Sequence, residues 1–370
     1  MIYFNLSDCA IYGEDRVNVA YLSKNNYIST ENMLPDRRGI CPATSLPNIH
    51  SVTKFVSGDI LLSNIRPYFK KIWLAEYNGG CSNDVLVIRA KNGTDPHFLY
   101  YVLSDTNFFN YATATAKGTK MPRGSKAAIM KYLIPAFDLP TQEKIASILS
   151  AYDDAIENNN KRIKILEKMA ENLYREWFVR MRFPGHETAE YENGLPKGWS
   201  VQKVGEIVSR LPFNKLYKKS DLLPDGNVIV VDQSAEEYIG FHNDEPSHFS
   251  DINHPIIIFG DHSCKYQLMT QNFSLGENVI PFTGKNCNTI FLFYAIRGIV
   301  TTTEYKRHWG ELITKKILFP QIELQNKFAK MIAPCLQLER QLSSNNYNLT
   351  KQRNYQLLRL MSGKMEVTSR

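Results

Sequence analysis

The sequence predicts an α+β protein in which two mixed α/β lobes are joined by two long helices that form an antiparallel coiled coil, with a pseudo-twofold internal repeat. Three observations lead to this fold. The chain has 370 residues, more than the roughly 250 to 300 that one core usually holds. A motif near the middle recurs half a chain later, which indicates an internal duplication. Each copy is followed by a long amphipathic helical pattern.

The repeat sets the predicted boundaries. Residues 132–146 (YLIPAFDLPTQEKIA) are echoed by residues 317–329 (ILFPQIELQNKFA), about 185 residues later. A strand-like segment precedes each copy, at 58–63 and 255–260. We therefore expect a first lobe over 1–138, a central long helix over 139–183, a second lobe over 184–320 and a C-terminal helix over 321–370.

Within the lobes, short runs rich in β-branched and aromatic residues lie between Gly, Pro, Asn and Asp. The runs at 84–88, 227–231 and 289–293 are typical of strands. Residues 97–103 and 125–132 favour short helices instead. Each lobe is therefore expected to mix strands and helices.

Residues 141–180 contain no Gly or Pro and predict the first long helix. An apolar seam with spacings of three and four residues predicts a coiled coil, although the helix could instead lie on one lobe. At about 1.5 Å per residue it would extend some 60 Å and overhang a lobe, so a partner helix is expected. The seam consists of Ile145, Leu149, Tyr152, Ile156, Asn159, Ile163, Leu166, Ala170, Leu173 and Trp177.

The second copy supplies that partner helix. Leu338, Leu342 and Leu349 continue a seam that begins at Met331 and Cys335, while Pro334 is expected to remove one backbone hydrogen bond and kink the helix. Two lobes that alternate with two rods close only if the rods pair antiparallel. Asn159 and Asn345, one on each seam, either fix the register or face solvent.

Bulk properties exclude several classes of protein. No signal peptide and no apolar run of about 20 residues is visible, so a cytoplasmic protein that does not span a membrane is expected. The six cysteines lie far apart, which favours reduced thiols over a metal site or disulfides. The net charge of +7 suggests a polyanionic partner.

The positive charge is concentrated locally. No acid falls between Asp105 and Asp138, and this interval contains a turn of cations, small residues and a hydroxyl suited to phosphate contact, although a solvated loop is the alternative. We predict DNA-binding residues in this turn, at the matching place in the second lobe, and in two further basic clusters. They are Lys117, Thr119, Lys120, Arg123 and Lys126; Lys306, Arg307 and His308; Arg66, Lys70 and Lys71; and Lys215, Lys218 and Lys219. Trp309 is expected to pack in the core.

No sequence motif for catalysis is present. The chain lacks the (Asn/Asp)-Pro-Pro-aromatic motif of amino-methyltransferases, a Gly-rich phosphate loop, His-Glu-x-x-His and Gly-x-Ser-x-Gly. We therefore expect no catalytic residue, metal ligand or cofactor in this chain, and an enzyme activity only in its partners.

Several motifs carry a family resemblance. Residues 133–135 (LIP), 139–150 (LPTQEKIASILS) with Asp153, and 172–178 (NLYREWF) resemble the central conserved region of the specificity subunits of type I restriction-modification systems. Residues 194–199 (GLPKGW), 305–309 (YKRHW) and 357–364, which end in MSGK, are also similar to that family. The resemblance spans nearly the whole chain, but residues 1–7 lack the opening motif of the second lobe.

The resemblance implies a non-catalytic subunit with two target-recognition domains. Each would read one half of a bipartite site on double-stranded DNA, with the paired helices as a ruler. Two methyltransferase subunits would dock on this chain and restriction subunits would join through them, so that S-adenosylmethionine, Mg²⁺ and ATP bind only to partners. The alternative is a coiled-coil adaptor for proteins that does not read DNA, which a weak salt dependence of DNA affinity would reveal.

The ruler leads to a prediction about the spacer between the half-sites. Four residues inserted near Asn159, about one helical turn, would move the lobes apart by about 5 to 6 Å at most, or one to two base pairs. If the partner helix accommodates the insertion, methylome sequencing should show a spacer longer by that amount and unchanged half-sites. Circular dichroism checks that the variant folds. Altered half-site bases with the old spacer would contradict the ruler.

Overall fold

The structure is a computed structural model that describes residues 2–302 and 304–361. It divides into two compact units, Met1–Glu157 with Asn346–Arg370, and Asn158–Asn345. Each unit therefore contains one lobe and a part of each long helix, whereas the sequence predicts boundaries where the lobes meet the helices. The units are described separately.

The first unit contains two four-stranded sheets and a short strand pair. One sheet has the order β2-β9-β6-β7, the other has the order β3-β5-β8-β4, and β1 pairs with β10. The elements are β1 (Tyr3–Asn5), α1 (Leu6–Cys9), β2 (Ala10–Tyr12), β3 (Arg16–Asn18), η1 (Val19–Tyr21), β4 (Tyr27–Ile28), β5 (Ser51–Phe55), β6 (Ile60–Ser63), η2 (Pro67–Phe69), β7 (Ile72–Leu74), β8 (Gly79–Cys81), β9 (Val85–Ala90), α2 (Pro96–Ser104), α3 (Thr106–Ala114), α4 (Lys126–Ile129), β10 (Leu133–Pro135) and the start of α5 (Leu139–Tyr174).

The second unit repeats this plan. The order β14-β20-β17-β18 corresponds to the first sheet, and β13 pairs with β21 as β1 pairs with β10. The sheet β16-β15-β19 keeps a parallel pair (β15 with β19, as β4 with β8), but its antiparallel strand β16 lies beside β15, whereas β5 lies beside β8. The elements are η3 (Arg175–Val179, a π-helical turn), η4 (His186–Thr188), β11 (Tyr191–Glu192), β12 (Leu195–Pro196), β13 (Ser200–Lys203), α6 (Val204–Ile207), β14 (Val208–Arg210), η5 (Lys219–Asp221), β15 (Val228–Val231), β16 (Gly240–His242), β17 (Ile256–Gly260), β18 (Tyr266–Met269), β19 (Phe273–Leu275), β20 (Val279–Gly284), α7 (Thr289–Ile296), α8 (Trp309–Thr314), β21 (Lys316–Phe319) and α9 (Ile322–Met361).

The predicted duplication is thus confirmed at the level of topology. The opening strand β1 forms and pairs antiparallel with β10 although residues 1–7 lack the motif that precedes β13. Backbone pairing with β10 needs no particular side chain, so the strand survives the loss of the motif.

One predicted strand is wrong. Residues 289–293 lie in helix α7, whose N-cap residue Asn288 accepts hydrogen bonds through its side chain from the backbone N–H groups of Ile290 and Phe291. Residues 290–296 of this helix are all apolar and all buried. The helix therefore has no polar face and no helical periodicity, and its sequence resembles that of a buried strand. The helix expected over 125–132 is also shorter, four residues in α4.

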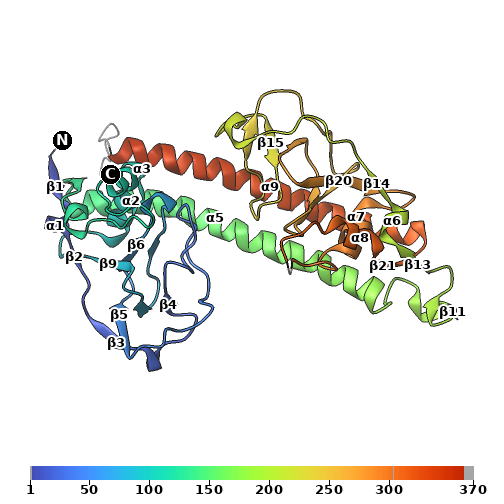
Figure 1. The fold of residues 1–370 in the computed structure, drawn as a ribbon, viewed down its shortest axis with the longest axis horizontal. Helices are drawn as coiled ribbons and strands as arrows, with labels where there is room; N and C mark the ends of the chain where they lie inside the picture. Colours follow the sequence, from blue (N-terminus) through green and yellow to red (C-terminus); the bar gives the residue numbers. More distant parts are fainter. Residues whose placement is uncertain (1, 303, 362–370) are drawn as a thin grey trace. The chain divides into compact units, whose positions relative to one another are not determined.

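The long helices pair antiparallel within each unit (Figure 1). In the first unit, Ile145 and Leu149 of α5 share one core with Leu357 and Leu360 of α9, and Asp153 forms an ion pair with Arg353. In the second unit, Trp177 and Phe178, which follow α5, share a core with Phe328 near the start of α9. The predicted antiparallel coiled coil is therefore confirmed.

The seam of the second helix differs from the prediction. Met331 is 51% exposed, and the buried positions near it are Phe328, Ile332 and Leu336. Helix α9 continues through Pro334 without a break in the helix assignment. Asn159 is buried and Asn345 is exposed, so only Asn159 remains a candidate for setting the register. Residues 362–364 of the MSGK motif lie outside the described residues.

A buried glutamine attaches each long helix to its lobe. Gln142 Oε1 accepts from the backbone N–H of Asp95, the N-cap residue of α2 (2.9 Å), and its amide donates to the Phe137 carbonyl (2.8 Å). Gln325 makes the same pair of bonds, with the Asn288 backbone N–H (2.9 Å) and the Pro320 carbonyl (2.8 Å). These two residues occupy matching positions in the repeat, so we call each arrangement the glutamine clamp.

The clamp leads to a prediction about stability. Gln325 is fully buried, so Gln325→Ala leaves a buried donor and acceptor unpaired and should cost about 1 to 3 kcal/mol of unfolding free energy. Urea unfolding measures this loss. The control Gln337→Ala changes an exposed glutamine of the same helix and should stay within about 0.5 kcal/mol of the parent. Equal effects of the two substitutions would contradict a specific role for the clamp.

Candidate nucleic-acid interface

Two turns of the first lobe pack against each other and bring the predicted cations together. They are the turn between β6 and β7 (64–71) and the segment between α3 and the start of α4 (117–126). The Arg66 backbone N–H donates to the Pro122 carbonyl (2.8 Å), and the Gly124 N–H donates to the Asn64 carbonyl (3.0 Å). We call these two segments the first-lobe platform. The sequence suggested both segments as sites but not their contact.

The tip of the platform is a closed loop. Lys117 and Arg123 exchange backbone hydrogen bonds of 2.9 and 2.8 Å, and Gly118 has φ +98°, a conformation that favours glycine. Lys117, Thr119 and Lys120 are exposed at this tip. A rigid loop with exposed cations can hold phosphate groups with little loss of conformational entropy on binding.

The other first-lobe cations differ in their availability. The Arg123 guanidinium pairs with the Asp84 carboxylate at 2.9 Å, although 60% of its side chain remains exposed. Lys126 is exposed and its Nζ lies 5.7 Å from the centre of the Tyr12 ring. Lys71 donates to the Thr30 carbonyl (2.6 Å), and burial lowers the pKa of its ammonium group. Lys71 is therefore a weaker candidate than Lys117 or Lys120.

The second lobe builds a comparable arrangement from 261–265 and 304–309, the second-lobe platform. The His308 backbone N–H donates to the Asp261 carbonyl (2.8 Å), and His262 Nδ1 lies 3.1 Å from the Lys306 carbonyl oxygen. The His262 ring stacks on the Tyr305 ring with 4.8 Å between centroids. The turn between β17 and β18 thus meets the segment before α8, as the turn between β6 and β7 meets the segment before α4.

The predicted residues of the second-lobe platform have different environments. Arg307 is 79% exposed, with Nε 3.8 Å from the Asp261 carboxylate, and Lys306 lies 3.7 Å from the Glu304 carboxylate. His308 is fully buried, so its side chain is not at the surface where DNA would bind. That expectation is corrected, because the chain turns His308 inward at the start of α8. Trp309 packs against Phe259 and Phe282, as expected for a core residue.

The 215–219 cluster lies on another segment of the second lobe. Lys215 pairs with the Asp244 carboxylate at 2.8 Å, and Lys218 and Lys219 are exposed. Leu216, the neighbour of Lys215, lines a cavity of about 470 Å³ together with Arg210, Arg307 and Trp309. The structure therefore connects this cluster to the second-lobe platform through the cavity wall.

Sequence reasoning missed the residues that hold these platforms. Asp84 pairs with a cation, and Asp261 accepts hydrogen bonds through Oδ1 from the backbone N–H groups of His308 and Trp309. Both residues follow a buried strand or precede one, a place where an isolated acid often has a structural role, but no motif marks them.

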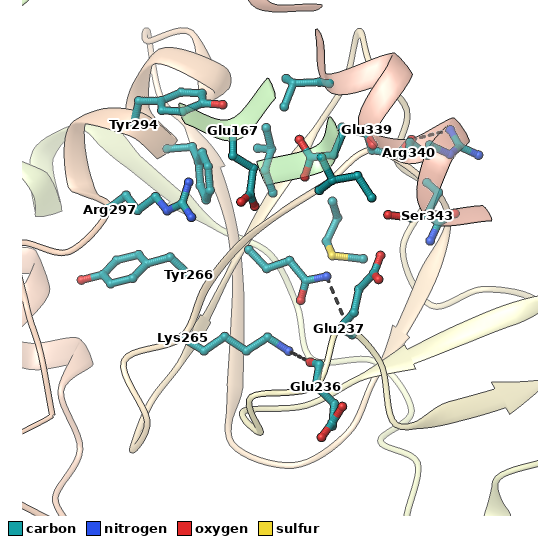
Figure 2. Close-up of a pocket in the computed structure, with 18 of the residues that line it drawn as sticks. Glu167, Glu236, Glu237, Lys265, Tyr266, Tyr294, Arg297, Glu339, Arg340 and Ser343 are labelled. Carbon is teal, nitrogen blue, oxygen red and sulfur yellow. Dashed lines mark hydrogen bonds between the residues drawn. The ribbon is translucent and has the colours of Figure 1, made fainter. Parts of the chain in front are cut away.

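A second cavity of the second unit is lined by four carboxylates and three cations, and we call it the acidic cavity. Figure 2 shows that Glu167 of α5, Glu237 of the 232–239 loop and Glu339 of α9 line it; its volume is about 400 Å³. Burial, and then the nearby Glu167 carboxylate, raise the pKa of Glu339 to about 7. The cations Lys265, Arg297 and Arg340 also line it, but the carboxylates outnumber them, so we do not assign this cavity to DNA.

The fold and the platforms define a class: internally duplicated α+β proteins whose two lobes, each with a cation-bearing surface turn, are carried on paired long helices. Comparison with known proteins shows which family this chain resembles. Residues 24–168, less than half of the chain, match the family model of the type I restriction modification DNA specificity domain. The resemblance found in the sequence is confirmed by this match.

Known specificity subunits are also similar to this chain in sequence. The chain is 29% identical over 183 residues to the type I restriction enzyme MjaIX specificity subunit of Methanocaldococcus jannaschii; the match covers 47% of this chain and 42% of that protein. It is 25% identical over 317 residues to the putative MjaX specificity subunit of the same organism, covering 75% of this chain and 72% of that protein. The match thus spans less than half of the first relative.

The fold also matches a solved structure. The crystal structure of the type I restriction-modification S subunit from M. genitalium superposes with a TM-score of 0.57 at 17% identity, covering 99% of this chain and 96% of that one. Among the residues described here, no helix is long and apolar enough to span a membrane, and no three His, Cys, Asp or Glu side chains group as metal ligands would.

The acidic cavity leads to a prediction about pH. Because the folded-state pKa of Glu339 is raised to about 7, the folded protein holds a proton that the unfolded chain releases near pH 4.3. Stability should therefore be lost as pH rises from about 4.3 to 7. Glu339→Gln removes this loss, so urea unfolding at pH 8 should show a more stable variant, with a clearly smaller gain at pH 5 and none at pH 4.

The matched control is Glu323→Gln, which changes an exposed carboxylate on the same helix. Its effect should be small and similar at each pH value. A Glu339→Gln variant that is no more stable than the parent at pH 8 would show that the cavity tolerates the charged carboxylate.

Proposed function

We propose that this chain is the sequence-specific DNA-binding subunit of a type I restriction-modification complex. Each lobe reads one half of a bipartite double-stranded site through its platform. The observation that carries the proposal is the hydrogen bond from the Arg66 backbone N–H to the Pro122 carbonyl in the first lobe, because it joins two basic segments that are far apart in sequence into one surface. The match of residues 24–168 to the family model of the DNA specificity domain supports this proposal.

The chemistry of the platforms fits DNA. Exposed Lys117 and Lys120 neutralise phosphates, which fixes the protein on the duplex, while Arg123 and Arg307 carry the planar donor groups that pair with guanine. Arg123 is already held by Asp84. A guanidinium fixed in this way keeps donors free for a base and loses less entropy on binding.

We also propose that the long helices are a scaffold on which two methyltransferase subunits dock, and that restriction subunits join the complex through them. In the second unit, Ile165 and Met169 of α5 are 59% and 55% exposed, and exposed apolar residues on a helix are suited to docking a protein. S-adenosylmethionine, Mg²⁺ and ATP would bind to those partners. This chain itself would be non-catalytic.

A coiled-coil adaptor that does not read DNA is the other candidate. The same exposed residues of α5 favour it, but it does not account for the cations gathered on the first-lobe platform. The two functions differ in whether the chain binds DNA with a steep dependence on salt.

The prediction concerns Lys120, Arg123 and Lys126. Replacing all three with Ala removes up to three phosphate contacts, so the slope of log affinity against log salt should fall by nearly one unit per lost contact. If Arg123 reads guanine, its single replacement should relax one base position, at about 1 to 3 kcal/mol. Fluorescence anisotropy of the full chain on duplex DNA measures both.

Lys24→Ala is the control, because Lys24 is an exposed cation of the same lobe outside the platform. A triple variant with the affinity and salt slope of the parent would remove the first-lobe platform from the interface. A parent chain that shows no salt-dependent affinity for DNA would favour the adaptor.

A further inference from the structure

The turn between β6 and β7 exposes two aromatic rings at the first-lobe platform. Tyr68 is 48% exposed and Phe69 is 39% exposed, and their ring centroids lie 4.8 Å apart. Across the platform, Met121 is 51% exposed. Exposed aromatic rings that lie side by side next to cations are suited to stacking against a bound ligand.

The protein holds this turn in a fixed conformation. Arg66 and Lys70, which flank the one-turn helix Pro67–Phe69, both adopt left-handed backbone angles, φ +50° and +52°. This conformation is unfavourable for residues other than glycine and is concentrated at functional sites. The Phe69 and Lys70 carbonyls also accept from the backbone N–H groups of Asp36 and Arg37, each at 2.9 Å. The two rings are therefore presented on a rigid support.

The cations around the two rings indicate which kind of molecule binds there. The Tyr68–Phe69 pair is flanked by Arg66 and Lys70 in its own turn, and that turn packs on the segment that carries Lys117 and Lys120. An apolar protein surface would leave these cations unpaired, whereas nucleic acid offers phosphates to the cations and base faces to the rings. Charge complementarity thus favours DNA.

We propose that Tyr68 and Phe69 form an aromatic wedge that stacks against bases of the first half-site. The inference rests on the proposed DNA-binding function and adds a contact that does not use hydrogen bonds. Apolar wedges separate base steps at a cost that depends on the step, least for flexible pyrimidine–purine steps. The aromatic wedge would therefore favour half-sites that contain a base step that is easily unstacked.

The test uses the full chain and a duplex that carries the recognition site found by methylome sequencing with and without this gene. 2-Aminopurine is placed in turn at each adenine of the first half-site, because its fluorescence rises on unstacking. The parent should increase the fluorescence at one step. Tyr68→Ala and Phe69→Ala should abolish the increase and weaken binding by about 5- to 100-fold, the usual range for a stacked base.

Three comparisons distinguish a wedge from a loss of charge or of folding. Tyr68→Phe keeps the ring and should keep the signal. Tyr21→Ala removes an 81% exposed tyrosine of the same lobe, outside the platform, and should leave both readouts unchanged. The salt slope of Tyr68→Ala should equal that of the parent, since no phosphate contact is lost.

The outcomes also separate this inference from the proposed function. Salt-dependent, sequence-selective binding without any fluorescence increase, or with full affinity in Tyr68→Ala and Phe69→Ala, would overturn the wedge and leave DNA reading intact. A chain without salt-dependent affinity for DNA would overturn the proposed function and the wedge together.

Discussion

The glutamine clamp is the interaction on which the arrangement of each lobe depends. In each lobe one glutamine side chain near the start of a long helix links that helix to two other segments. It accepts a hydrogen bond from the N-cap residue of α2 or α7, and it donates one to the carbonyl five residues before it. An amide can do this because it has a donor and an acceptor at one end. The N-cap residue differs between the lobes, Asp95 in one and Asn288 in the other. The clamp allows this difference because the glutamine bonds only to the backbone N–H of the N-cap residue.

The two lobes share a backbone arrangement but differ in the side chains on their surfaces. The sheets β2-β9-β6-β7 and β14-β20-β17-β18 have the same strand order, and in both lobes the turn after β6 or β17 meets the segment before a short helix. The side chains on this frame differ: two aromatic rings and several lysines in the first lobe, a His262–Tyr305 stack and Arg307 in the second. Hydrogen bonds between backbone groups join the two segments of each platform, so side chains other than Asp84 and Asp261 can change without loss of these contacts.

The sequence predicts the long-range plan better than the local detail. The repeat and the seams are visible because they recur over many residues, and the structure bears them out. The sequence does not reveal helix α7 because burial on every side removes its periodicity, and it misplaces Met331 because spacings of three and four allow two neighbouring registers. It predicts His308 as a DNA-binding residue because the sequence does not show which way a turn directs a side chain. The contact of Arg66 with Pro122 depends on tertiary packing alone.

The first unit combines early and late parts of the chain, and this affects how it folds during synthesis on the ribosome. Its core contains Leu6 and Ile60 from the beginning of the chain and Leu357 and Leu360 from the end. At about 5 to 20 residues per second, the second unit takes on the order of ten to forty seconds to be made in between. Throughout that time the first lobe has an uncovered apolar surface where the last helix will pack, while the second lobe, built from one continuous stretch, is complete first. The lobe that is translated first is therefore the one that finishes folding last.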